Sequence, residues 1–587
     1  MSYDTFLIAL TRKPVADVIL SGGSLVNVYT GEVYEADVAI FGERILAVGK
    51  VGDFASTRTK FIDCSGYYLV PGLLDAHIHL ECSKLSVTSF SKLVVPRGTT
   101  SVVSGLDQIY VVAGLRGVRD FLQESKNTPL KIFWCIPSRL PYTYPPSTVG
   151  HRLTFKEHRR AQKWIDCYGV WETVKEFIVN GDPVVIKAMK LAMRNKLPVL
   201  GCGPMSAGSI LSLFAASGVR ADHESYTVEE TIEKLRNGVL AVIRESSVAH
   251  FLRTNIKAIT EHGISPDRFC FCTDDVISSD VLRHGHLDKL VRMAVEEGVD
   301  PVKAIQMASL NCAMTYRIDH LVGSIAPGRY ADILLVDNLK KFNVKKVISN
   351  GELVASEGRL LKDIKPPARA RYLLKTFKCP PITHAKLMIK APSKSERVRV
   401  LSMQVSREVP FVRKRREAVL KVKDGIVYPD VEQDVLYVMV YPRYSKKTRP
   451  AVAFISGFEF KSGAMASSAS PDDNNIICVG ANLNDMSIAV NKVIKEEGGQ
   501  VVVNNGKILE FLPLPIGGIV SDISPEEMAE KEQKIDEAAR RLGCNLPSPF
   551  MYLIFLSITA IPDYAITDRG LVDCNKLKVI NPILGAA

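Results

Sequence analysis

Residues 69–81 have the sequence Leu-Val-Pro-Gly-Leu-Leu-Asp-Ala-His-Ile-His-Leu-Glu, an apolar strand that follows a Pro-Gly turn and carries two histidines. Side chains two residues apart on a strand project to the same face, so His77 and His79 converge on one point. Neutral imidazoles on a rigid strand are suitable ligands for a divalent metal. We therefore interpret this stretch as part of a metal site rather than as two unrelated histidines.

The region that follows this motif alternates expected strands with expected helices. Residues 71–319 span 249 positions, near the typical size of an eight-fold β/α barrel. Apolar strands separated by helical patterns indicate a parallel sheet with helices outside it. The eight strands are expected at residues 72–80, 100–105, 131–136, 169–173, 198–203, 218–223, 239–244 and 268–274.

Polar side chains gather at the carboxyl ends of these expected strands, which form the active face of such a barrel. In chain order they are His77, His79, Asp107, Gln108, Ser138, Glu172, Cys202, His223, Glu224, Arg244, Glu245, Asp274 and Asp275. Their recurrence at one strand end after another indicates a single site rather than a random scatter of polar groups.

Four of these residues form a plausible metal shell. Three nitrogen ligands and one carboxylate, with one position left for water, suit a catalytic Zn²⁺, Mn²⁺ or Fe²⁺, and they come from His77, His79, His223 and Asp274. The metal would lower the pKa of its water toward neutrality and create the nucleophile of a hydrolase. Asp274 is the candidate that takes the proton from this water and hands it to the departing group.

Several charged residues near these strand ends are ambiguous. Glu172, Glu224 and Glu245 are acid or base candidates, although each alone is more often an ion-pair partner or a helix cap. Arg244 suits either a substrate contact or a structural ion pair. The residues alone leave these alternatives open.

The sequence divides into four predicted segments. Strand patterns at 16–50 and 328–357 predict that residues 1–70 and 320–365 pair into one small β-sandwich domain around the barrel of residues 71–319. Residues 366–424 form an expected basic connector, and residues 425–587 an α+β domain. All eleven histidines lie at or before His384, so we expect the last domain to serve as packing or as a lid.

The net charge of +12 comes from one stretch of the chain. Residues 361–423 hold 18 lysines and arginines against 4 acidic residues, so the rest is about neutral. This stretch is poor in aromatic side chains for base stacking, which favours a solvated basic connector over a contact with nucleic acid or an acidic surface.

The sequence also gives expectations about location. It contains no run of 18 uncharged apolar residues, and the segment 550–562 is too short to span a membrane. No secretory signal is evident near Met1, and the twelve cysteines form no Cys-x-x-Cys pair. Buried thiols in a reducing cytoplasm, without a membrane partner, are the expected state.

Ten motifs together resemble one known family over nearly the whole chain. They are Pro71-Gly-Leu-Leu-Asp-Ala-His-Ile-His-Leu-Glu81, Arg97-Gly-Thr-Thr100, Ala221-Asp-His-Glu224, Val242-Ile-Arg-Glu245, Cys272-Thr-Asp-Asp275, Gly285-His-Leu-Asp288, Ile325-Ala-Pro-Gly-Arg-Tyr-Ala-Asp332, Ala464-Met-Ala-Ser-Ser468, Leu512-Pro-Leu-Pro-Ile516 and Thr567-Asp-Arg-Gly-Leu571. This set resembles the adenine deaminases of the amidohydrolase superfamily. The last three motifs match that family's C-terminal domain, whereas the barrel motifs alone would indicate only the superfamily.

The resemblance implies hydrolysis of adenine to hypoxanthine and ammonia with divalent metals, usually manganese or iron. By position, the metal-site residues are His77, His79, His223 and Asp274, with Cys202 where the family has a histidine after the fifth strand. Glu172 and Glu245 match carboxylates near the substrate, and Glu224 and Arg244 are the expected substrate contacts. We also expect a homo-oligomer that binds a small purine.

The chain departs from the family pattern at chemically important positions. Gln108 stands where the resemblance implies a bridging glutamate, and a neutral amide supplies no negative charge between two cations. The Cys202 thiolate suits zinc or iron better than manganese. In the last domain, Pro471 and Asn474 replace expected histidines, and residues 441–444 replace a His-rich stretch. Two alternatives therefore stay open: an amidohydrolase for another purine or cyclic amide, and a catalytically silent homologue with a binding role.

Overall fold

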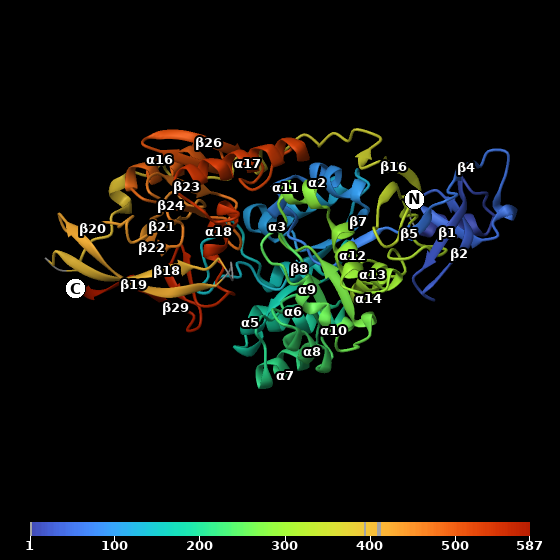
Figure 1. Cartoon of the computed structure of the whole chain (residues 1–587), viewed down its shortest axis with the longest axis horizontal. Helices are drawn as coiled ribbons and strands as arrows, with labels where there is room; N and C mark the ends of the chain where they lie inside the picture. Colours follow the sequence, from blue (N-terminus) through green and yellow to red (C-terminus); the bar gives the residue numbers. More distant parts are fainter. Residues whose placement is uncertain (1–2, 393–394, 408–411) are drawn as a thin grey trace.

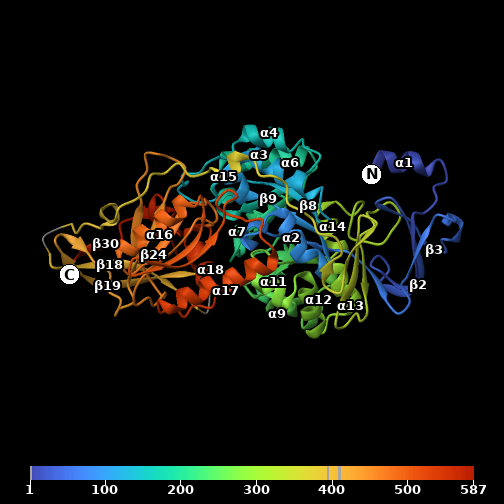
Figure 2. The same ribbon diagram turned by 90° about the horizontal axis from the view of Figure 1, so that it is seen from above.

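The computed structural model describes residues 3–392, 395–407 and 412–587. Three bodies follow one another along the longest axis: an N-terminal sheet, a central β/α barrel and a C-terminal domain (Figure 1). The view from above shows the same succession, with the barrel in the middle (Figure 2). Within the described ranges, no helix has the length and apolar character needed to cross a membrane.

The barrel contains all eight strands that the sequence predicts, each parallel to the next along the chain. Their bounds are β6 (Leu73–Asp75), β7 (Thr99–Ser104), β8 (Lys131–Pro137), β9 (Cys167–Val174), β10 (Val199–Cys202), β11 (Val219–Asp222), β12 (Leu240–Arg244) and β13 (Phe269–Cys272). The residues after β6 and β13 close the ring, because Ile78 pairs with Asp274 in a parallel bridge. The predicted (β/α)8 barrel is confirmed.

Helices cover the outside of the barrel, as the alternating pattern predicts. Amphipathic α12 (Leu287–Glu296) shows why, because Leu287, Leu290, Val291 and Ala294 lie on its buried face. Other helices of this layer are α6 (Pro183–Arg194), α7 (Gly208–Ala216), α8 (Val228–Arg236), α13 (Pro301–Met307) and α14 (Leu310–Tyr316).

The two flanks of the barrel pair into one sheet, as expected. Antiparallel pairing of β5 with β14 places Leu69 opposite Leu335 and joins the two parts. The strands of this sheet are β1 (Val18–Asn27), β2 (Glu32–Phe41), β3 (Arg44–Gly49), β4 (Lys60–Asp63), β5 (Tyr68–Pro71), β14 (Ile333–Val336), β15 (Val344–Ser349), β16 (Glu352–Ser356) and β17 (Arg359–Leu360). Gly72 then leads into β6, and a Cβ there would lie 2.2 Å from Thr100 Oγ1, so the turn requires glycine.

The predicted basic connector is wrong for residues 397–423, which belong to the C-terminal sheet. This sheet contains β18 (Arg397–Val405), β19 (Arg413–Lys423), β20 (Ile426–Val427), β21 (Leu436–Tyr441), β22 (Ala451–Ser456), β23 (Ala464–Ser467), β24 (Ile476–Gly480), β25 (Gly499–Asn504), β26 (Lys507–Pro513) and β30 (Ile583–Ala586). The dense charge hides the alternation of a strand, in which Ala418 and Leu420 are buried between exposed neighbours. Arg413 is itself buried and donates to the carbonyl oxygens of Phe555 and Ile558.

The C-terminal domain packs against the barrel near the carboxyl ends of its strands. Helix α17 (Pro525–Arg541) lies beside α11 (Ser278–His284), as both views show (Figure 2). A buried ion pair joins Lys84 Nζ to Glu532 Oε1 at 2.7 Å across this interface. Because the contact lies next to the metal motif, the domain is placed to cover the barrel mouth.

His158 makes folding stability depend on pH. Burial lowers the pKa of this imidazole from 6.5 to about 4. Its Nε2 donates to Ser138 O and its Nδ1 accepts from Gln162 Nε2, so the neutral ring is satisfied and a second ring proton would face a donor. The unfolded chain takes up the proton near pH 6.5, so this contribution is complete above pH 6.5 and is lost as pH falls toward 4.

We therefore expect His158→Asn to flatten the acid dependence of stability. Each pH unit below 6.5 costs the wild type about 1.4 kcal/mol through this residue, and the variant loses that slope. Urea unfolding at several pH values measures the difference. His262→Asn, at an exposed histidine, is the matched control and should keep the wild-type slope; an unchanged slope in His158→Asn would contradict the assignment.

Candidate metal centre

The ends of β6 and β13 hold the paired histidines and Asp274 in a fixed register. The amide of Asp274 donates to His77 O at 2.9 Å, and the amide of His79 donates to Asp274 O at 3.0 Å. Below them, buried Asp75 accepts from the Thr273 hydroxyl at 2.6 Å. These hydrogen bonds bring His77, His79 and Asp274 together, although the two histidines and Asp274 lie at opposite ends of the barrel sequence.

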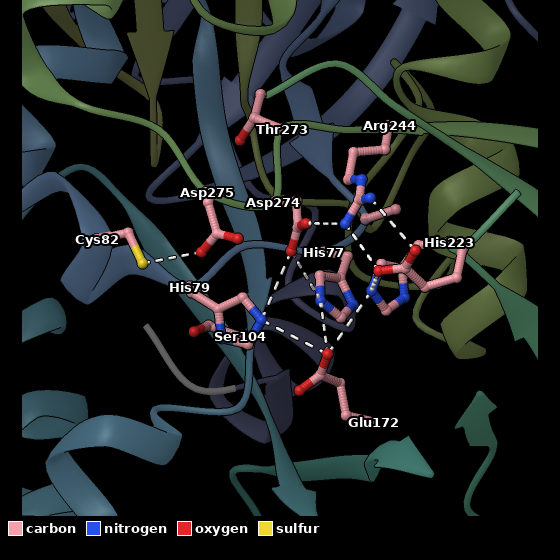
Figure 3. A network of polar contacts seen from close by, with 12 residues as sticks. His77, His79, Cys82, Ser104, Glu172, His223, Arg244, Thr273, Asp274 and Asp275 are labelled. Atoms are coloured by element: carbon pink, nitrogen blue, oxygen red, sulfur yellow. Dashed lines mark hydrogen bonds and ion pairs between the residues drawn. The ribbon is translucent and has the colours of Figure 1, made fainter. Parts of the chain in front are cut away.

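One group of ligand atoms surrounds the Asp274 carboxylate. His77 Nε2 lies 3.4 Å and His79 Nε2 3.5 Å from Asp274 Oδ1, and Figure 3 shows both rings turned toward it. His77, His223 and Asp274 together form one set of atoms that could hold a metal ion. The predicted convergence of imidazoles and a carboxylate is therefore present in the structure.

Glu172 stands at the centre of the three histidines. Its Oε1 lies 3.8 Å from His77 Nε2, 3.6 Å from His79 Nε2 and 3.6 Å from His223 Nε2 (Figure 3). The same carboxylate belongs to a second candidate ligand group with Cys202 and His223. One carboxylate thus faces both groups of ligands.

Both central carboxylates sit on strained backbone. Glu172 has φ +37° and Asp274 has φ +59°, in the left-handed region that L-residues rarely adopt. Such conformations cost free energy and gather at functional sites, where surrounding structure enforces them. Glu172 lies within β9 and Asp274 lies just beyond β13, and both carboxylates face the cluster.

The electrostatics of the cluster keep two imidazoles ready for a metal. Burial lowers the pKa of His77 to about 4, and burial together with His77 lowers the pKa of His223 to about 3. Both rings are therefore neutral and can donate a lone pair to a cation. Burial opposes ionisation of Asp274, but the Arg244 guanidinium and His77 hold its pKa well below the usual range.

The donor atoms fit a divalent cation. His77 Nε2 and Asp274 Oδ1 are buried, and neither makes a hydrogen bond within the described chain. Leaving such atoms unpaired is costly, and a cation between them satisfies both. The remaining nitrogen of His79, Nδ1, lies 3.1 Å from Asp107 Oδ1, which orients the ring and leaves Nε2 for the cation.

Arg244 and Glu224 lie at the same site but are engaged with each other. Arg244 Nη1 donates to Glu224 Oε1 at 2.7 Å. The same nitrogen donates to Asp274 Oδ2 at 2.7 Å (Figure 3). Both residues line the pocket that contains the histidines. Arg244 therefore fixes the orientation of Asp274 as well as facing the pocket.

The Glu245 carboxylate is not brought to this cluster, and its predicted place near the substrate stays a prediction. Its carboxylate accepts from His250 Nδ1 at 2.8 Å and from Lys289 Nζ at 3.2 Å. The chain after β12 folds back, with Glu245 bridged to His250, and successive side chains point to opposite sides. Arg244 consequently faces the pocket and Glu245 faces away.

Gln108 brings no negative charge to the centre, whereas the Glu172 carboxylate faces all three histidines. The Gln108 amide donates to Cys82 Sγ at 3.4 Å, and Cys82 donates to Asp275 Oδ1 at 2.8 Å. Gln108 is thus joined through Cys82 to Asp275, which lines the pocket and belongs to a candidate ligand group with His79 and Asp274.

Sequence reasoning missed the residues that close the pocket from above. They come from the C-terminal domain and from barrel loops, namely Tyr142, Tyr226, Pro471, Asp472, Phe555, Ile558, Ala560 and Ile561. The apolar segment 550–562 carries part of this wall, so its hydrophobicity reflects contact with the barrel mouth. Their distance along the chain from the histidine motif leaves no local signal of this role.

Comparisons with known proteins agree with this arrangement. The Amidohydrolase family matches residues 68–354, and the Adenine deaminase C-terminal domain matches residues 410–578. Adenine deaminase 4 of Rhizobium meliloti is 53% identical, covering 97% of this chain and 95% of that protein. Adenine deaminase 1 of Desulfotalea psychrophila is 52% identical, with 97% and 96% covered. Adenine deaminase 1 of Latilactobacillus sakei is 47% identical, with 97% and 96% covered.

Proposed function

Because the chain belongs to the adenine deaminase family of amidohydrolases, we propose that it hydrolyses adenine to hypoxanthine and ammonia with a divalent metal. The observation that carries this proposal is the convergence of three imidazoles and two carboxylates in one buried cluster. A silent homologue has no need to keep these atoms in register. The near full-length identity to adenine deaminases favours adenine over another purine or cyclic amide.

The metal ligands we propose come from overlapping groups of ligand atoms in the cluster, and one of these groups joins His77, His79 and Glu172. The proposed ligands are His77, His79, His223, Asp274 and Cys202, with the Glu172 carboxylate shared between the groups. These residues would hold a divalent cation, which would lower the pKa of a bound water toward neutrality and so supply the nucleophile. The shared position of Glu172 supports two ions per chain. The Cys202 thiolate supports Zn²⁺ or Fe²⁺, whereas Mn²⁺ follows from the family alone.

Asp274 is suited to move the proton that hydrolysis requires. Arg244 holds Oδ2, so Oδ1 keeps a fixed direction toward the histidines. Water attack on the purine carbon that bears the amino group releases one proton, and the departing nitrogen must gain one to leave as ammonia. We assign the transfer to Asp274, with Glu172 as the second acid–base group.

The polar and aromatic walls of the pocket fit a flat purine. Glu224 and Arg244 are the proposed polar contacts on the barrel side, and Tyr142 and Tyr226 offer aromatic surface. Residues of the C-terminal domain complete the wall and exclude water from the reaction.

Asp472 is the proposed contact from the C-terminal domain. Its side chain lines the metal pocket, is only 9% exposed, and its Oδ2 has no hydrogen-bond partner among the described residues. A ring N–H of the purine can donate to this oxygen. We expect Asp472→Asn to raise KM for adenine about tenfold while kcat changes little, since the contact is made equally before and during reaction.

Steady-state kinetics of Asp472→Asn measures this split. Asp473→Asn is the matched control, because the neighbouring carboxylate accepts from the Asn475 amide at 3.0 Å and does not line the pocket. A normal KM in Asp472→Asn, or an equal rise in both variants, would contradict the contact.

Ammonia release is the direct test of the proposed function. Chelated protein is reloaded separately with Zn²⁺, Fe²⁺ and Mn²⁺ and assayed with adenine, guanine and cytosine, while elemental analysis gives the metal content. Adenine should be the preferred substrate. Metal-loaded protein that releases no ammonia from adenine would support the silent homologue, and preference for another base would support the other amidohydrolase.

The cellular setting follows from cysteine chemistry. The twelve cysteines are all buried and free of disulfides, which supports a reducing compartment, and we propose the cytoplasm. Homo-oligomerisation stays a prediction.

A further inference from the structure

A large hollow opens at the amino-terminal ends of β10, β11 and β12, the end of the barrel opposite the metal centre. Its volume is about 1060 Å³, enough for a nucleotide-sized molecule. Its lining includes the cationic residues Lys196, Arg220, Arg268 and Arg317.

The charged groups of this hollow are all basic. Five lysines and arginines and one histidine line it, and none of its described lining residues is acidic. Arg236 is neutralised by Glu233 at 2.6 Å. The nearby Asp267 accepts from the Ser265 hydroxyl and lies 3.6 Å from Lys303 Nζ, so its charge is engaged by another cation.

Four cations in the hollow have no acidic partner within 4.0 Å in the described part of the chain: Lys196, Arg220, Arg268 and Arg317. Like charges held together without counter-charges raise the free energy of the fold unless an anion neutralises them. Arg220 shows this repulsion, because burial and then the charges of Arg317 and Arg268 lower its pKa.

Two of the guanidinium groups are held in place by the backbone. Arg220 Nε donates to Thr315 O at 2.7 Å and its Nη2 to Met314 O at 3.2 Å, at the end of α14. Arg317 Nη1 donates to Lys196 O at 2.8 Å. These bonds leave other N–H groups unused, and a guanidinium fixed in this way is preorganised to bind oxyanions.

We propose that this basic hollow binds a phosphorylated small molecule of the nucleotide class. The cations match several phosphate oxygens, and the apolar residues Leu197, Pro198 and Ile264 offer surface for a ring system. A free phosphate or pyrophosphate shares the anionic chemistry but not the apolar contact. The four cations together favour a ligand with more than one negative charge.

The hollow lies at the far ends of the strands that carry the metal centre. Strand β10 ends in Cys202, β11 leads into His223 and β12 ends in Arg244, so the two sites share three strands. Four to five residues of strand separate them, on the order of 15 Å. An anion bound in the hollow therefore contacts the amino-terminal ends of the three strands whose other ends carry the metal ligands, and it does not enter the catalytic pocket.

Calorimetric titration of the full-length protein with ATP, pyrophosphate and adenosine tests the proposal. We expect saturable binding of ATP, weaker binding of pyrophosphate and none of adenosine, with affinity falling as salt increases. The variant Lys196→Gln/Arg268→Gln should weaken ATP binding about tenfold or more, because it removes two cations from the phosphate contact. Neither side chain donates a hydrogen bond within the described residues, so the fold should be retained.

The matched control is Lys446→Gln/Lys447→Gln, which removes the same charge from an exposed loop of the C-terminal domain and should bind ATP normally. Equal affinity for pyrophosphate and ATP would show that the hollow binds the phosphate groups and makes no contact with the ring, so the anion site would stand and the nucleotide preference would not. No saturable binding below about 5 mM overturns the proposal. So does ATP binding that is unchanged in the hollow variant, since phosphates could then be held by the metal centre.

Discussion

Replacing Asp274 with asparagine is expected to lower kcat for adenine at least about a thousandfold. Oδ1 of Asp274 is a proposed metal ligand and the proposed proton carrier, and a neutral amide can perform neither role well. The change also removes the negative charge that faces the buried Arg244 guanidinium at Asp274, while the contact of Arg244 with Glu224 stays. Several contributions to the same step are therefore lost together.

The measurement combines ammonia release with metal content. We expect Asp274→Asn to retain less metal than the wild type and to stay inactive when excess metal is restored. Circular dichroism establishes that the variant is folded. Full activity of a folded Asp274→Asn protein would remove Asp274 from the mechanism.

Glu245→Gln is the informative control for this experiment. The sequence alone makes Glu245 an acid–base candidate alongside Glu172 and Glu224, whereas in the structure its carboxylate faces His250 and Lys289. We expect kcat for adenine to change less than about threefold, with the main effect on stability through the lost Lys289 contact. A loss as large as that of Asp274→Asn would show that Glu245 reaches the substrate.

The contrast between these two residues shows which parts of the site the sequence can predict. His77, His79 and Asp274 follow from strand periodicity, because each stands directly at or after the end of a buried strand. The direction of Glu245 depends on how the chain beyond β12 folds back, which strand periodicity does not encode.

Contacts between distant segments set a second limit on prediction. Asp472 and Phe555 reach the pocket only because the C-terminal domain packs over the barrel, and nothing near them in sequence indicates a ligand site. The basic run that begins at Arg413 looks like a solvated connector because local charge outweighs the alternation of Ala418 and Leu420. Its burial needs carbonyl acceptors from residues more than a hundred positions away.

The strand position of Glu172 can be predicted from the sequence, whereas its contacts in the site cannot. The sequence places it at the end of β9, and the resemblance places it near the substrate, but its central position among three histidines appears only in three dimensions. Because Glu172 faces all three histidines, the cluster has a central carboxylate even though residue 108 is a neutral glutamine.

The second large effect is expected at Cys202. We predict that Cys202→His shifts metal preference from Zn²⁺ or Fe²⁺ toward Mn²⁺, changing the ratio of affinities about tenfold or more. A thiolate is a soft ligand that favours zinc and iron, whereas imidazole lowers that bias. Burial and the nearby Glu172 charge raise the pKa of the Cys202 thiol, so the wild type must also release a proton when metal binds.

Equilibrium dialysis against each metal, followed by elemental analysis and ammonia release, measures this change. Proton release on metal loading should be smaller in Cys202→His, because a neutral imidazole binds without losing a proton. Cys167→Ser is the matched control, since that buried thiol faces Gly169 O and lies outside the ligand groups. If Cys202→His keeps both the wild-type metal preference and its proton release, the thiol does not bind the ion, and His223 with Glu172 must hold that side of the centre alone.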